Sequence, residues 1–333
     1  MRGERHYIIE PMRIAVIVGA LLAPSLAFAQ FGVSPIDQLT LDISPKNPRP
    51  YATVTVTPQS SLINLANSTM TLSVDGTRVY SGPTQSVSVA MPGPGRSTTV
   101  VARVTSLGQT SSASMKLTPT DVSIVIEPFS TTPALYKGKP MPAQSGRVRL
   151  VAVADLRSSP TARLDPDTLS YTWSIDGTRL INSSGIGKHS VILPSPLPYR
   201  SQTVSVTVVS PGGSLTGSDS LSLSSSPATL RLYIHDPLQG TLFDHALNTS
   251  QDLAGTETTF VAVPYSFTNA NGSPTIQWFV NDELSETGPA ITLRTEGAGS
   301  GTAALTATVT SGLEALSQNL SLSFGQSTNF FGL

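Results

Sequence analysis

The chain has 333 residues, of which 39% are hydrophobic and only 12% are charged, about half the charged share of an average globular protein. Its formal net charge is −1 and no basic run occurs, so nucleic-acid binding and a polybasic membrane patch have no electrostatic support. Cysteine is absent, which excludes disulfides, thiolate metal sites and cysteine nucleophiles. The chain is long enough for two or three domains, and packing alone must stabilise them.

The first 29 residues have the pattern of an export signal. Three arginines precede or flank the start of a short apolar run at 14–22, and Ala27-Phe28-Ala29 forms an A-x-A cleavage site. The apolar run is shorter than the roughly 20 residues that a membrane-spanning helix needs. We therefore expect a signal peptide at 1–29; an uncleaved N-terminal anchor is the alternative. The mature chain, without a membrane span, is expected to be extracellular, at the cell surface or periplasmic. A cysteine-free exported chain fits a bacterial or archaeal source.

A linker at 30–37 leads to the first of three repeats, which we place at 38–118. Alternating apolar residues predict strands at 39–43, 51–57, 70–74, 87–89, 99–105 and 113–117. With the return strand of the hairpin at Asp75-Gly76, this makes about seven short strands separated by turns, the pattern of an immunoglobulin-like sandwich.

The second repeat is placed at 121–225 and the third at 228–325. The closing hairpins of the three repeats can be aligned on Ser106, Ser210 and Ser311, which lie 104 and 101 residues apart. A pitch of about 100 residues is the size of one sandwich domain rather than of a solenoid repeat. The sequence therefore predicts an all-β protein with three tandem immunoglobulin-like sandwiches after the signal peptide.

The clearest strand-turn-strand unit contains Trp173. Tyr171, Trp173 and Ile175 share one face of a strand, and Asp176-Gly177 suits a type I′ turn because both residues tolerate positive φ. The inward register predicts that the tryptophan is a core residue rather than a sugar-stacking surface. The unit recurs around Leu72 in the first repeat and around Trp278 in the third.

These hairpins resemble those of tandem bacterial immunoglobulin-like domains, including the PKD type. The resemblance rests on the Trp173 to Gly177 kernel, on its Trp278 to Asp282 counterpart and on the alternating strand pairs around them, and it covers nearly all of 38–325. The first repeat departs from it, with Leu72 in place of tryptophan. The resemblance implies a surface, adhesion or pilus-associated protein, and the lack of a catalytic constellation predicts that it has no enzymatic activity. The alternative is a carbohydrate-binding or accessory region of a secreted hydrolase system.

The residues that could carry chemistry form no recognised constellation. His189, His235 and His245 lack zinc-ligand spacing. His235-Asp236 and Asp244-His245 are both expected in the loop after the first strand of the third repeat, where polar loop residues explain them as well as a metal site does. We expect no catalytic, cofactor-binding or metal site.

Two further sequence features could suggest ligand binding. Asp165 and Asp167 could bind calcium near a domain end, but they lack the carboxylate density and the glycine of a recognised calcium loop. Gly297 to Gly301 looks like a phosphate loop, but it lacks the following lysine and the helix of one, so we expect a flexible hairpin loop.

Partner binding is expected through strand edges or through the apolar tail at 326–333, for which a loose end or a last strand is the alternative. No pattern of residues supports a glycan ligand, although Phe279 and Tyr199 are aromatic residues whose substitution would test one. Phe279 lies on the strand face opposite Trp278 and is expected to be exposed or to cover an inter-domain contact.

Overall fold

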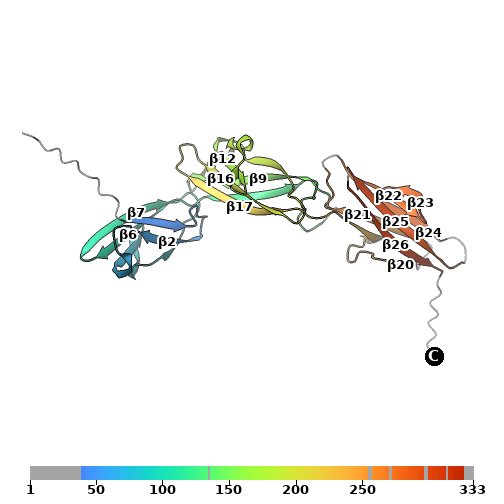
Figure 1. Cartoon of the computed structure of the whole chain (residues 1–333), viewed down its shortest axis with the longest axis horizontal. Helices are drawn as coiled ribbons and strands as arrows, with labels where there is room; N and C mark the ends of the chain where they lie inside the picture. The colour runs from blue at the N-terminus through green and yellow to red at the C-terminus, as the bar shows by residue number, and fades with distance from the viewer. Residues whose placement is uncertain are drawn as a thin grey trace, which may run out of the picture.

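The computed structural model describes residues 39–133, 136–253, 257–269, 272–295, 299–312 and 314–325. In this part of the chain the regular structure is almost entirely β-strand, arranged as three sandwiches one after another along an elongated molecule (Figure 1). The described helical segments are single 3₁₀ turns: η1 (Leu65–Asn67), η2 (Pro166–Thr168) and η3 (Ile181–Ser183). No helix in these ranges is long and apolar enough to span a bilayer.

The first sandwich packs a three-stranded sheet against a four-stranded one. The first sheet has the order β1 (Thr40–Ser44), β2 (Thr53–Gln59), β5 (Val87–Ala90). The second has the order β4 (Thr77–Pro83), β3 (Thr69–Val74), β6 (Thr98–Ser106), β7 (Gln109–Leu117). All neighbouring strands are antiparallel. This arrangement confirms the predicted immunoglobulin-like fold, with alternate residues of each strand reaching one core.

The second sandwich repeats this plan with additions. One sheet has the order β15 (Ser190–Pro194), β9 (Arg147–Asp155), β8 (Asp121–Pro128). The other has the order β13 (Thr178–Arg179), β12 (Ser170–Ile175), β16 (Ser201–Val209), β17 (Thr216–Ser224), and β14 (Gly185–Ile186) also pairs with β12. A small hairpin of β10 (Arg157–Ser159) and β11 (Ala162–Arg163) forms in the polar segment that follows β9.

The third sandwich packs a four-stranded sheet against a five-stranded one. Its first sheet has the order β19 (Gly240–Thr241), β18 (Thr229–Asp236), β21 (Glu257–Tyr265), β24 (Ala290–Arg294). Its second has the order β20 (Ser250–Leu253), β26 (Glu314–Phe324), β25 (Gly301–Ser311), β22 (Thr275–Val280), β23 (Glu283–Thr287). Strand β20 runs parallel to β26 and closes the outer edge of that sheet.

Each sandwich has its own hydrophobic core. Trp173 and Trp278 are fully buried at the centres of the second and third cores, and Leu72 is fully buried in the first. The indole N–H groups donate to backbone carbonyls, Trp173 to Lys188 at 2.9 Å and Trp278 to Gly288 at 2.9 Å. The predicted inward register is confirmed, and neither indole leaves a buried donor without an acceptor.

The turns that follow these core residues have the predicted geometry. Asp75 and Gly76 have φ values of 48° and 82°, and Asp176 and Gly177 have 49° and 80°. Positive φ at both central positions is the requirement of a type I′ turn, whose twist matches that of the flanking strands. Glycine meets this requirement without strain, and aspartate tolerates it better than most residues.

Candidate functional site

The histidines and acidic residues singled out in the sequence do not converge. Within the described ranges no group of three or more histidine, cysteine, aspartate or glutamate side chains could hold a metal ion. Asp165 caps the 3₁₀ turn η2 by accepting from the N–H of Asp167 at 3.0 Å. His189 contacts the Gly187 carbonyl at 3.0 Å and lies 3.8 Å from the Asp167 carboxylate. Asp165 and His189 therefore each contact residues close to them in the chain.

The expected position of His235-Asp236 is wrong. Both residues are the last of strand β18 rather than part of the loop after it, because they pair with Thr241 and Gly240 of β19. Asp236 then accepts hydrogen bonds from the N–H groups of Gln239 and Leu238, and these bonds lower the pKa of its carboxyl. Asp236 therefore stabilises the turn between β18 and β19. Asp244-His245 lies between β19 and β20, with a side-chain contact of 3.1 Å at the surface.

The remaining sequence candidates are dispersed. Phe279 is partly buried rather than fully exposed, whereas Tyr199 is fully exposed, with φ of 61°. The glycine run starting at Gly297 lies partly outside the described residues, and the tail at 326–333 lies wholly outside them. The signal peptide predicted at 1–29 also lies outside them.

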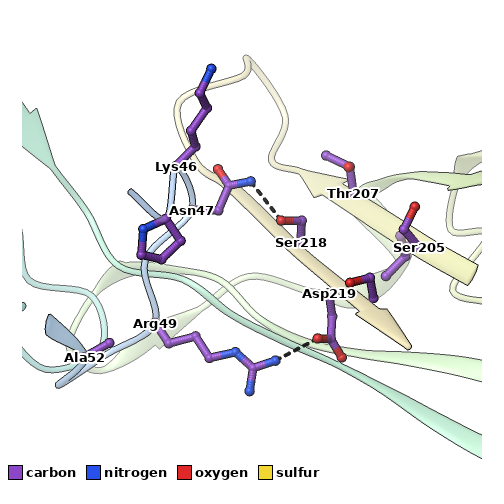
Figure 2. Close-up of a pocket in the computed structure, with 11 residues that line it drawn as sticks. Lys46, Asn47, Arg49, Ala52, Ser205, Thr207, Ser218 and Asp219 are labelled. Atoms are coloured by element: carbon purple, nitrogen blue, oxygen red, sulfur yellow. Dashed lines mark hydrogen bonds and ion pairs between the residues drawn. The ribbon is translucent and has the colours of Figure 1, made fainter. Parts of the chain in front are cut away.

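A polar site lies between the first two sandwiches (Figure 2). A cavity of about 550 Å³ is lined by the segment between β1 and β2 and by strands β16 and β17. Residues from both sides project toward each other, and Asn47 donates from Nδ2 to the Ser218 hydroxyl at 2.9 Å (Figure 2). The described residues of the lining include hydroxyls, one carboxylate and two cations but no histidine.

Arg49 makes the central contacts of this junction. Its guanidinium donates to the Val122 carbonyl at 2.7 Å and to the Asp219 carboxylate at 3.0 Å, and it lies 3.8 Å from Asp121. The second oxygen of Asp219 accepts from the N–H of Ile124 at 2.8 Å. One carboxylate therefore joins β17 to β8 within the second sandwich and also holds the arginine of the first.

Backbone contacts reinforce the same junction. Thr120, which is almost fully buried, donates its N–H to the Pro48 carbonyl at 3.0 Å and its hydroxyl to the Thr216 carbonyl at 2.8 Å. On another side Gly95, with φ of 69°, lies against the backbone of Ser159 and Pro160. A Cβ at Gly95 would overlap that backbone, so the close approach requires glycine.

The hairpin that meets Gly95 is held by a charge cluster. Asp155 accepts from the Arg157 guanidinium at 2.8 Å and lies 3.7 Å from Arg163. The hydrogen bond from Arg157 is the main cause of the lowered pKa of Asp155. A planar guanidinium that binds a carboxylate through two nitrogens fixes the geometry of both side chains.

The second junction uses backbone pairing. Thr131, in the long loop of the second sandwich, donates its N–H to the Phe267 carbonyl at 2.8 Å and accepts at its own carbonyl from Ser266 at 3.0 Å. A further bond runs from Asn269 N–H to the Phe129 carbonyl at 3.2 Å. A segment of one domain thus pairs like a short strand with a segment of the next, and Phe267 is fully buried there.

Aromatic side chains gather beside this second junction. The rings of Tyr136 and Tyr265, from different sandwiches, meet edge to face at 6.0 Å. The hydroxyls of Tyr233 and Tyr265 lie 3.0 Å apart, and Phe243 packs on Tyr233 at 5.1 Å. Burial, and then the hydrogen bond with Tyr233, raises the pKa of Tyr265 above its usual value.

Sequence reasoning missed both junctions. Arg49 stands in a Pro-rich turn without a motif, and Thr131 in a loop rich in proline and glycine. Only long-range geometry pairs Arg49 with Asp219, and such pairing leaves no local pattern in one sequence.

Comparison with known proteins adds structural likenesses only. No protein-family model and no curated protein matches the sequence. Among solved structures, three N-terminal domains of the bacteriophage RB49 highly immunogenic outer capsid protein (Hoc) are 12% identical with a TM-score of 0.28, covering 86% of this chain and 99% of that one. Fibronectin(III)-like modules of Clostridium thermocellum CbhA are 12% identical (TM-score 0.27; 57% and 94% covered). Immunoglobulin domains 1–5 of Sidekick-1 are 11% identical (TM-score 0.27; 84% and 56% covered).

Proposed function

We propose that this is an exported, non-catalytic structural or adhesion-type protein, a surface spacer or protein-binding module associated with a pilus or the cell envelope. The observation that carries the proposal is the pair of bonded junctions. Three sandwiches, each with its own core, are joined by Arg49 to Asp219 and by Thr131 to Phe267 into one extended molecule (Figure 1). Such a chain holds its first and third sandwiches apart, which is what a spacer does.

Features of the sequence also support the proposed function. The A-x-A site at Ala27 to Ala29 and the apolar run before it support export to the periplasm, the cell surface or the medium. The Trp173 and Trp278 hairpins support a bacterial, PKD-type origin of the sandwiches. The exposed apolar residues Val125, Val153 and Ile192 lie on the strands of one sheet of the second sandwich and suit protein contacts.

The experiment is fractionation of cells that produce the full chain with a C-terminal tag, followed by mass measurement of the mature N-terminus. We expect envelope, pilus or extracellular fractions to contain a chain that begins at Gln30. Ala29→Asp should block processing, whereas Ser25→Asp, outside the A-x-A positions, serves as the matched control. Cytosolic protein with an intact N-terminus would contradict the proposal.

A second function, carbohydrate binding within a secreted hydrolase system, rests on one observation. The ring of Tyr199 is fully exposed on the second sandwich, as a sugar-stacking residue would be. A glycan array with wild type, Tyr199→Ala and Phe279→Ala tests it. Glycan binding that Tyr199→Ala abolishes and Phe279→Ala leaves unchanged would favour this function over the spacer. Phe279 serves as the comparison because its ring is partly buried.

A further inference from the structure

The sheet formed by β8, β9 and β15 of the second sandwich has an apolar patch on its outer face. Successive side chains of a strand lie on opposite faces of a sheet, so the residues between the buried ones on these strands point away from the core. The central residues of this outer face, which we call the aliphatic patch, are Val125 on β8, Val151 and Val153 on β9, and Ile192 on β15. Val125 is 50% exposed, Val153 49% and Ile192 44%.

The register of the strands makes the aliphatic patch continuous. Val125 lies opposite Val151, and Ile192 lies opposite Arg149, the outward neighbour of Val151 on β9. Side chains directly opposite each other on one face have Cβ atoms about 4.5–5.5 Å apart, and diagonal neighbours are about 7–8 Å apart. The patch is therefore one surface, unlike the single exposed apolar residues that are common on any protein.

The first sandwich shows that the fold does not require aliphatic residues at these positions. Its sheet of β1, β2 and β5 has the same antiparallel order as β8, β9 and β15. The outward residues of β2 include Thr53, Thr55 and Thr57, and Ser88 of β5 lies opposite Thr55. Threonine is β-branched, as valine is, and also suits a strand. The aliphatic patch thus adds exposed apolar surface that the strands do not need.

Polar and charged residues border the aliphatic patch. A cavity of about 530 Å³ beside it is lined by residues of the sheet, among them Arg149, Val151 and Ile192, and by Asn182 and Lys188 of the segment before β15. Two carboxylates in this region have basic neighbours: Glu127 lies 3.2 Å from Arg149, and Asp167 lies 3.8 Å from His189.

Arg147 and Lys188 supply further positive charge. Both are exposed, and neither has an ion pair within the described residues. Arg147 is the next outward residue of β9 beyond Arg149, and Lys188 lies two residues before Ser190, which is opposite Val151. The two cations therefore flank the aliphatic patch along the direction of the strands.

We propose that the aliphatic patch and its two flanking cations bind an acidic segment of another protein, in which apolar side chains lie between carboxylates. The inference rests on the proposed function as a protein-binding module and deepens it by naming the surface and the kind of partner. An apolar centre with a polar rim is the usual anatomy of a protein interface. The unpaired cations set the sign of the partner's charge, because complementary charges speed association and like charges suppress wrong partners.

The composition of this face favours a protein over a glycan or a lipid surface. Lipid-binding surfaces bury tryptophan, phenylalanine or leucine among the headgroups, and aromatic rings are the side chains that stack on sugars. Strands β8, β9 and β15 contain no aromatic residue, and the Arg149 guanidinium lies over the nearby ring of Phe129, 5.6 Å from its centroid. Short β-branched side chains on a sheet instead form a flat apolar surface that another protein can cover.

The probe is a library of random dodecapeptides displayed on phage and selected against the purified mature chain. We expect the enriched peptides to combine aspartate or glutamate with aliphatic residues. Binding of a synthesised enriched peptide should weaken about tenfold in the double variant Val153→Thr/Ile192→Thr, which keeps β-branched side chains but removes apolar surface. Val79→Thr is the matched control, because Val79 is 51% exposed on β4 of the first sandwich.

A second pair of variants tests the charge requirement. Lys188→Glu should weaken binding of the same peptide about fivefold and reduce its dependence on salt, because a screened attraction becomes a repulsion. Lys116→Glu reverses the charge of an exposed lysine in the first sandwich and should change neither the affinity nor the salt dependence.

The inference is overturned if no peptide is enriched, if the enriched peptides lack acidic residues, or if Val153→Thr/Ile192→Thr binds them as wild type does. A concentration-dependent dimer in sedimentation equilibrium, or binding to anionic phospholipid vesicles, that this double variant abolishes would also overturn it and would assign the patch to a second copy or to a membrane. These measurements use purified protein, whereas the proposed function is tested by fractionation of cells, so the failure of one is distinguishable from the failure of the other.

Discussion

The carboxylate of Asp75 accepts a hydrogen bond from the backbone N–H of Thr99 at 2.7 Å. The Thr98 hydroxyl donates to the other oxygen at 2.7 Å. The same contact recurs in each sandwich, from Thr203 N–H to Asp176 at 2.8 Å and from Ala304 N–H to Asn281 at 2.9 Å. The first central residue of each of these turns therefore anchors the neighbouring strand of its sheet, β6, β16 or β25, a role beyond its tolerance of positive φ.

The Asp75 contact predicts an acid-sensitive first domain. The bonds from Thr99 and Thr98 lower the pKa of Asp75 from its usual 3.8. A carboxyl with a lowered folded pKa contributes stability that is present above the unfolded pKa and lost as pH falls through the folded pKa. Asp75→Asn, which mimics neutral Asn281, should remove this dependence below about pH 4. The pH dependence is measured by hydrogen exchange of β6 peptides at a series of pH values, with β25 peptides of the third sandwich as the control. If β6 exchange has the same pH profile in Asp75→Asn and in wild type, the assignment is wrong.

The buried indole of Trp278 predicts a large loss of stability on truncation. Trp278→Ala should lower the free energy of unfolding of the third sandwich by about 3–5 kcal/mol, because it leaves a cavity and an unpaired Gly288 carbonyl. Val280→Ala, on the same strand but only partly buried, should cost about 1 kcal/mol. Denaturant-dependent hydrogen exchange of β22 and β25 separates this domain from the others. Similar losses for the two variants would mean that the indole is not the centre of the core.

The contacts of Arg49 predict that it restrains the first junction with little effect on stability. Both ends of the ion pair are partly exposed, so Arg49→Ala should cost at most about 1 kcal/mol in unfolding free energy. It should nevertheless broaden the distribution of distances between spin labels on the first and second sandwiches. Arg149→Ala, which removes the surface pair with Glu127 inside the second sandwich, is the control. An unchanged distribution in Arg49→Ala would show that Thr120 and Gly95 hold the junction without it.

Backbone pairing at Thr131 predicts a junction that proline disrupts. Thr131→Pro removes the N–H that bonds Phe267 and the hydroxyl that accepts from it. We expect faster tryptic cleavage after Lys137, in the same loop, because the loop loses its attachment to the third sandwich. Thr132→Ala, an exposed neighbour, should cleave at the wild-type rate. Protection that survives Thr131→Pro would indicate that the Tyr136 contact is sufficient.

The parts of the fold that the sequence could predict are those with a local pattern. The inward row Val148, Leu150, Ala152 and Ala154 alternates in the sequence and is buried in the structure, and the Asp-Gly pairs marked their turns. Strand β20 had no such pattern: Ser250-Gln-Asp-Leu253 is polar, and it becomes a strand because β26 offers a parallel partner some seventy residues away. The boundaries proposed for the three repeats and the absence of a catalytic site stay predictions.

Strand β26 is bonded along both of its edges, to β25 over its whole length and to β20 at its end, where the Ser323 hydroxyl also donates to Asp252. A force that pulls on the chain beyond Phe324 along the strand axis would load both ladders in shear, so that many hydrogen bonds must break together rather than one after another. The third sandwich is therefore built to resist tension at that end.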